Sequence, residues 1–237
     1  MATVYAGTSG WAYASWKPDF YPPKLSAAKF LGYYAGRLNS VEVNYTFRST
    51  PTEKLLTGWI EATPPGFLFA IKAHQRITHI KRLRDAGEDT ERFVSSLEPL
   101  RAAGKLGPVL FQLPPFLKCD LPRLEDFLTA LPRPLRPAFE FRHESWFSDA
   151  VFDALRKANA ALCEAESEKL ETPQVQTADF SYLRLRKETY SAKTLRELTA
   201  RVNELARRGD AFVYFKHEDT PEGAQCAETL LSSGGDR

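Results

Sequence analysis

The chain has 237 residues, 43% of them hydrophobic, which is enough apolar material for one large core. Its 32 basic and 30 acidic side chains give a net charge of +2, which argues against binding nucleic acid or membranes through an overall field. Three cysteines without a CxxC pair indicate neither a disulfide framework nor a cysteine zinc site. No apolar run approaches the ~20 residues of a membrane span, and no secretory signal precedes the first strand-like segment, so we expect a cytoplasmic protein.

Short runs rich in Val, Phe and Tyr alternate with amphipathic stretches along almost the whole chain. Eight such runs predict strands at residues 4–8, 40–45, 67–73, 108–113, 138–142, 161–165, 182–186 and 211–216. Between them, helices begin at recognisable signals, such as the capping box 50–53 with Pro51 at the first helical position. The connection 167–178 is short and contains Pro173, so the sixth helix should be short or missing.

Alternating strands and helices predict a parallel sheet, and eight strands in this length favour closure into a TIM-like (β/α)8 barrel. We expect one domain, residues 1–231, followed by a disordered tail at 232–237.

Polar residues recur near the carboxyl ends of the predicted strands, where barrels of this kind carry their functional groups. The period of two along a strand places them on one face, and we expect that face to point into the barrel. They are Glu42 and Asn44, Lys72, Gln112, Glu140 and Arg142, Glu164 and Glu166, Arg184 and Arg186, and Tyr214 and Lys216.

Together they would form a ring of Glu42, Lys72, Glu140, Arg142 and Arg184, with Asn44 and Gln112 between them. Such a ring suggests proton transfer beside an anion clamp, as in a hydrolase, lyase or isomerase. Lys72, Arg142 and Arg184 would bind a phosphate or carboxylate, with Asn44, Gln112 and Tyr214 as further ligand contacts. Glu42 and Glu140 are the candidate catalytic carboxylates. We expect the adjacent Arg to hold Glu140 ionised, and a deeper, less compensated Glu42 to have a raised pKa and act as an acid. The alternative is a salt-bridge network that only fills the barrel, although so large a network is costly without a function.

Two loops extend the candidate site. The loop at 10–25 is rich in aromatic residues, and Trp11 and Trp16 could stack on a sugar or base ring, or pack as a hydrophobic flap. The loop at 74–89 carries Arg76, His79, Lys81, Arg82 and Arg84 and could bind an anion through His79, or form an ordinary solvated face.

The sequence favours neither a metal site nor an organic cofactor. His74, His143 and His217 follow three different strands and could meet at a metal with Glu42 or Glu140, but no HxH or HExxH spacing supports this. No GxGxxG, P-loop or GxSxG pattern is present. We therefore expect no cofactor and no metal.

Several motifs together resemble the YecE-like family, also called domain of unknown function 72. They are GTSGW at 7–11, FYP at 20–22, VEVN at 41–44, FAIK at 69–72, ITH at 77–79, LFQLPP at 110–115, FEFRH at 139–143, YLR at 182–184 and YFK at 214–216. The resemblance covers essentially the whole chain and implies a TIM-like barrel found in bacteria and archaea. It supplies no reaction, cofactor or partner.

Three functional hypotheses follow. The first is an enzyme or binding barrel for a small phosphorylated or carboxylated ligand. The second is a metal-assisted phosphodiester hydrolase acting on nucleic acid, which the balanced charge weakens. The third is a non-catalytic barrel that acts through a protein partner, which the polar interior weakens. A membrane partner is not expected, and the oligomeric state is left open.

Overall fold

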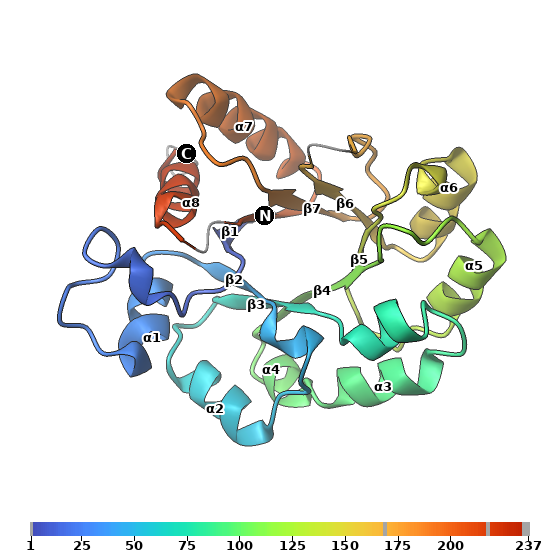
Figure 1. Cartoon of the computed structure of the whole chain (residues 1–237), viewed down its shortest axis with the longest axis horizontal. Coiled ribbons are helices and arrows are strands. Elements are labelled where there is room, and N and C mark those ends of the chain that lie inside the picture. Colours follow the sequence, from blue (N-terminus) through green and yellow to red (C-terminus); the bar gives the residue numbers. More distant parts are fainter. Residues whose placement is uncertain (1, 168–169, 217–218, 234–237) are drawn as a thin grey trace.

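The computed structural model describes residues 2–167, 170–216 and 219–233. Eight parallel strands form one sheet in the order β1-β8-β7-β6-β5-β4-β3-β2, and Figure 1 shows the helices arranged around them. The strands are β1 (Val4–Thr8), β2 (Ser40–Val43), β3 (Leu68–Lys72), β4 (Leu106–Gln112), β5 (Pro137–Glu140), β6 (Ala161–Ala165), β7 (Phe180–Leu185) and β8 (Asp210–Phe215). The predicted TIM-like barrel is confirmed.

The α-helices within the described residues are α1 (Phe30–Ala35), α2 (Glu53–Glu61), α3 (Gly87–Ser95), α4 (Glu98–Ala102), α5 (Leu121–Thr129), α6 (Asp149–Lys157), α7 (Ala192–Leu205) and α8 (Glu222–Ser232). None of them is long and apolar enough to cross a membrane. As predicted, the described part of the β6–β7 connection contains no helix.

Two helix ends differ from the expected boundaries. The side chain of Thr52 caps α2 by accepting a hydrogen bond from the Leu55 amide, so Pro51 precedes the cap and is not the first helical residue. Helix α8 includes Ser232, where we expected the disordered tail to begin. Residues 234–237 of that tail lie outside the described residues.

The strands have two packed faces. The larger apolar layer lies between the sheet and the helices, and a smaller one fills the amino-terminal half of the barrel interior. In that interior, Tyr5 stacks on Phe212 with ring centroids 4.8 Å apart, and Phe180 meets Phe212 edge to face. The amino-terminal half of the barrel is therefore filled mainly by apolar side chains, and the charged network described below lies at the carboxyl end of the strands, which we call the mouth.

The barrel has one unusual seam, between β1 and β2. Backbone pairing there is limited, in the described residues, to a bridge between Ser9 and Glu42. Side chains replace the other bonds: the Asn39 amide accepts from the Ala6 N–H (2.9 Å), and the Tyr34 hydroxyl accepts from the Thr8 N–H (2.8 Å) while donating to the Ser40 carbonyl (3.0 Å). These bonds satisfy buried backbone groups that a strand neighbour would otherwise pair.

Candidate functional site

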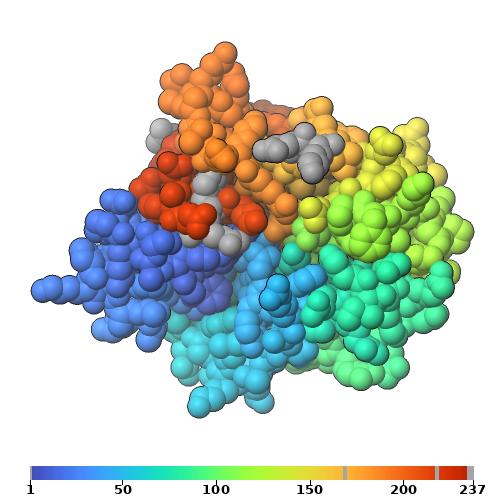
Figure 2. All heavy atoms as spheres, in the orientation of Figure 1, coloured from blue at the N-terminus to red at the C-terminus, as the bar shows by residue number. Residues whose placement is uncertain are grey.

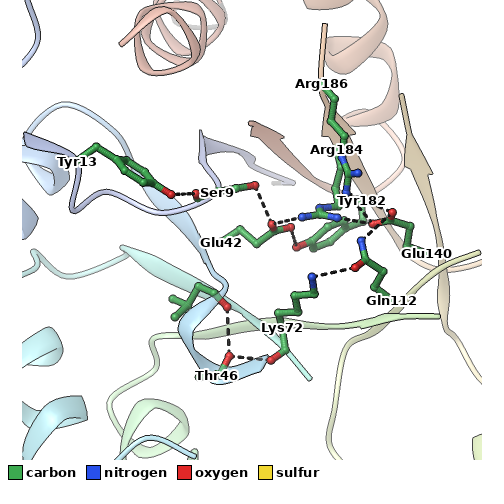
Figure 3. A network of polar contacts seen from close by, with 11 residues as sticks. Ser9, Tyr13, Glu42, Thr46, Lys72, Gln112, Glu140, Tyr182, Arg184 and Arg186 are labelled. Carbon is green, nitrogen blue, oxygen red and sulfur yellow. Dashed lines mark hydrogen bonds and ion pairs between the residues drawn. The ribbon is translucent and has the colours of Figure 1, made fainter. Parts of the chain in front are cut away.

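The centre of the mouth is a buried arginine held between two carboxylates (Figure 3). The guanidinium of Arg184, on β7, donates to Glu42 of β2 at 2.7 Å and to Glu140 of β5. All three side chains are at most 4% exposed. The Arg184 ion pairs thus connect opposite sides of the barrel through its middle.

The two carboxylates also accept hydrogen bonds from uncharged side chains. Glu42 accepts from the hydroxyls of Ser9 (2.8 Å) and Tyr182 (2.8 Å). Glu140 accepts from the amide of Gln112 at 2.9 Å, and the other end of that amide accepts from the Lys72 ammonium at 2.9 Å. Figure 3 shows Lys72, Gln112 and Glu140 as one continuous chain of contacts.

Both carboxylates are ionised at neutral pH. Burial alone would raise the pKa of Glu42, but the charge of Arg184 and the hydrogen bonds from Arg184, Tyr182 and Ser9 outweigh it and lower that pKa. Burial is likewise outweighed at Glu140 by Arg184, Arg186 and Gln112, and its pKa falls to about 2. The expectation of a raised pKa and an acid role for Glu42 was therefore wrong, because Glu42 is well compensated.

At Lys72, in contrast, the effects that disfavour the charged form outweigh those that favour it. Burial and the nearby charge of Arg184 lower its pKa to about 8, more than the charges of Glu42 and Glu140 raise it. Its ammonium lies 4.6 Å from the centre of the Phe47 ring, and His79 meets that ring edge to face at 4.9 Å. Burial, Lys72 and Arg142 lower the pKa of His79, which favours its neutral form.

We expect Lys72→Met to stabilise the protein at pH 7. Between pH 8 and about 10.5 the unfolded chain binds a proton on Lys72 that the folded chain has lost, so wild-type stability rises with pH in that window. Below pH 8 the folded protein bears the full cost of the buried charge. Removing it should add about 1–2 kcal/mol to the free energy of unfolding at pH 7, after subtracting the lost hydrogen bond.

The measurement is urea unfolding of both proteins at pH 7 and at pH 10, where the difference should shrink. The control is Lys105→Met, which removes an ammonium that donates three hydrogen bonds and should destabilise by about 2 kcal/mol or more. A loss of stability in Lys72→Met at pH 7 would contradict the interpretation.

A pocket of about 290 Å³ opens beside the network, between the ends of β5 and β6. Pairing between these strands is limited to Ala138 with Ala161 and Phe139 with Leu162, so their carboxyl ends diverge. Glu140, Arg142 and Arg186 line the pocket, together with Leu170 and Thr172 of the β6–β7 connection.

Unpaired polar atoms lie at this site. Arg186 donates to Glu140 only at 3.3–3.4 Å, and its Nε is buried without a hydrogen-bond partner within the described residues. The same is true of the Arg184 Nε and the Asn44 Oδ1. Buried polar atoms without a hydrogen-bond partner are rare in protein interiors. The occurrence of three of them at the mouth favours a site in which a ligand or water supplies the missing hydrogen bonds.

Four residues that we expected in the ring or its lining lie elsewhere. Trp16 is fully buried among Tyr13, Phe20 and Tyr21, and Trp11 packs edge to face on Trp59 of α2, so the flap interpretation is correct for both rings. Tyr214 is fully buried below the network, where its hydroxyl bonds to Ser40 Oγ at 2.7 Å. Glu164 points outward and pairs with Arg201 of α7, because Cys163 occupies the interior face of β6.

The structure also gives roles to residues that had no assigned role in the sequence analysis. Ser9 and Tyr182 fix Glu42, and Arg186 lines the pocket. The period of two in β7 extends from Arg184 to Arg186 and could have identified the latter as a ligand-binding residue. Nothing in the sequence marks the contact of Ser9 with Glu42, since it depends on how the seam closes.

The three-histidine metal hypothesis is not supported by the described residues, among which no group of three or more His, Cys, Asp or Glu is placed to hold an ion. His74 and His143 each accept a backbone N–H two residues ahead. His217 lies outside the described residues, as does any arrangement that includes it.

Comparison with known proteins agrees with the resemblance seen in the motifs. The family profile described as "Protein of unknown function DUF72" matches residues 5–236. The chain belongs to the DUF72 family. YunF of Bacillus subtilis (strain 168) is 31% identical over 156 residues, which are 63% of this chain and 54% of YunF. The chain spans about half the length of the curated relatives it matches.

Two solved structures place this DUF72 chain among barrels. A DUF72 family protein from Thermotoga maritima MSB8 is 28% identical and superposes with a TM-score of 0.84 over 98% of both chains. An AP endonuclease of family 2 from Brucella melitensis superposes with a TM-score of 0.54 over 98% of this chain and 99% of that one, at 7% identity. The second likeness shows the fold alone.

Proposed function

We propose that this DUF72 barrel binds, and acts on, a small phosphorylated or carboxylated ligand at its mouth. The observation that carries the proposal is the charge balance. Arg184 forms buried ion pairs with both Glu42 and Glu140 and offsets one of their two negative charges, while Lys72, Arg142 and Arg186 lie around the same centre and Arg186 contacts Glu140 at 3.3 Å. These six side chains therefore carry a net charge of +2 in a partly buried setting, where an anion is attracted.

The roles within this site differ from those the sequence suggested. Each terminal nitrogen of Arg184 already donates to a carboxylate, so a ligand would compete with Glu42 and Glu140 for it. Arg186 and the exposed Arg142 line the pocket and offer planar donors that suit a phosphate or carboxylate. Glu140 lines the same pocket and is held ionised, which suits it to accept a proton from a bound ligand.

The test is thermal unfolding in the presence of inorganic phosphate and of malonate, with sodium chloride added to equal ionic strength in the reference. At about 100 times Kd a bound ligand stabilises by ~2.7 kcal/mol, which is a rise of roughly 5 °C or more in Tm for a chain of this size. We expect the double variant Arg142→Met, Arg186→Met to lose most of this rise.

The matched control is Arg92→Met, which removes an exposed arginine of α3 that pairs with Glu88 outside the pocket. It should retain the full response to phosphate. Equal stabilisation of the wild type and the double variant by both anions would refute the proposed site.

A further inference from the structure

Two lysines on the barrel strands or beside them are withdrawn from water, but their ammonium groups are hydrogen bonded very differently. Lys105, just before β4 at the amino-terminal end, donates to the Thr63 carbonyl (2.9 Å), the Thr63 hydroxyl (2.9 Å) and the Pro64 carbonyl (2.6 Å). All three of its N–H bonds are thus used. Lys72, at the opposite end of the barrel, makes one hydrogen bond within the described residues, to Gln112. Its other two N–H bonds have no protein acceptor there.

The charged neighbours of Lys72 do not neutralise it directly. Glu42 and Glu140 are held by Arg184, and neither forms an ion pair with the Lys72 ammonium. The other titratable and charged groups around it are Arg184 and Arg186 of β7 and His79 of the loop after β3. An amine placed beside cations and partly out of water loses its proton more easily, which is how proteins prepare a nucleophilic lysine.

The groups around Lys72 also indicate how a bound anion would be oriented. Gln112 and Glu140 lie between Lys72 on one side of the mouth and Arg186 on the other (Figure 3). A small anion whose charged end contacts Arg142 and Arg186 would extend toward Lys72 across this pair. An electrophilic carbon near its other end would then meet the amine.

We propose that Lys72 is a nucleophile that forms an imine with the aldehyde or ketone carbon of a small carboxylate or phosphate ligand. This inference rests on the anion-binding function proposed above and names its substrate class. The neutral amine adds to the carbonyl carbon, and a C=N bond replaces the C=O bond. The two amine hydrogens leave with the carbonyl oxygen as one water molecule. At pH 7 about a tenth of a lysine with a pKa of about 8 is neutral, far more than of an ordinary lysine.

The test traps the imine on the folded, full-length chain. Glyoxylate, an anionic aldehyde, is added with cyanoborohydride, and peptide mass spectrometry locates the reduced adduct. We expect Lys72 to react at least about tenfold faster than the exposed Lys54 and Lys118, with half-maximal rate near pH 8. Acetaldehyde, which lacks the charge, should show a weaker preference for Lys72.

Variants distinguish the imine proposal from the anion-binding proposal on which it rests. Lys72→Arg keeps the positive charge but forms no imine, so it should lose the adduct. Arg142→Met with Arg186→Met should remove the advantage of glyoxylate over acetaldehyde. If phosphate stabilises the wild type but Lys72 reacts no faster than Lys54, the imine proposal is wrong and the anion site stands. If glyoxylate and acetaldehyde react equally with Lys72 and phosphate has no effect, the anion site is wrong and so is the proposed substrate class.

Discussion

Arg184→Met should lower the free energy of unfolding at pH 7 by about 3–5 kcal/mol, a large part of the stability of a typical domain. The substitution leaves the buried Glu42 and Glu140 without their shared partner, and an uncompensated buried carboxylate is costly. Urea unfolding measures the loss. Burial without Arg184 should raise both carboxylate pKa values above those of the unfolded chain, so the variant loses stability as pH rises. The deficit against wild type should therefore be smaller at pH 5 than at pH 8.

Two further variants make this prediction specific. Adding Glu42→Gln and Glu140→Gln to Arg184→Met removes the stranded charges and should recover most of the lost stability. Arg186→Met is the matched control, because that side chain is 24% exposed and its contacts with Glu140 are long, and it should cost about 1 kcal/mol or less. If Arg184→Met were as stable as the wild type, the two Arg184 ion pairs would not contribute to the stability of the barrel.

Gly7→Ala should be at least as damaging, with an expected loss of about 3 kcal/mol or more from overpacking and broken hydrogen bonds. A Cβ at Gly7 would lie 1.9 Å from the Ser40 carbonyl oxygen and 2.6 Å from the Tyr34 hydroxyl. The backbones of β1 and β2 would have to separate, and the Tyr34 bridge would be lost. Thermal and urea unfolding report the change.

Gly58→Ala is the paired control for the same chemical change. Gly58 is exposed within α2, and nothing lies within 4 Å of a Cβ added there. Alanine should stabilise the helix by about 0.5–1 kcal/mol. Similar effects of the two substitutions would contradict the close approach at the seam.

The fold could be predicted because the strand period and the alternation of elements are local signals. The polar face of most strands was predictable for the same reason, since Glu42, Lys72, Gln112, Glu140 and Arg184 each alternate with apolar neighbours. β6 was the exception. No helix follows β6 in the described part of its connection to β7, and Glu164 and Arg201 line a groove of about 210 Å³ outside this strand, so a polar residue on β6 could face outward.

The partners of each group could not be predicted from the sequence. Which carboxylates Arg184 would hold depends on distances across the barrel, and so do the pKa values of Glu42 and Lys72. The burial of Trp16 depends on how the first loop folds back over α1, and an aromatic-rich loop is compatible with either outcome. Figure 2 shows that the mouth face brings together segments from the beginning, middle and end of the chain.

We expect the barrel to open preferentially at the seam between β1 and β2. Between most neighbouring strands the amide protons are protected by backbone carbonyls, and exposing them requires two strands to part. The Ala6 and Thr8 amides are protected by the side chains of Asn39 and Tyr34, which can release them by rotating. At the carboxyl end of this seam lies the backbone bridge to Glu42, whose side chain pairs with Arg184. If the proposed ligand shifts Arg184, we expect β1 and β2 to separate more or less often, so that amide exchange along β1 would report occupancy at the mouth.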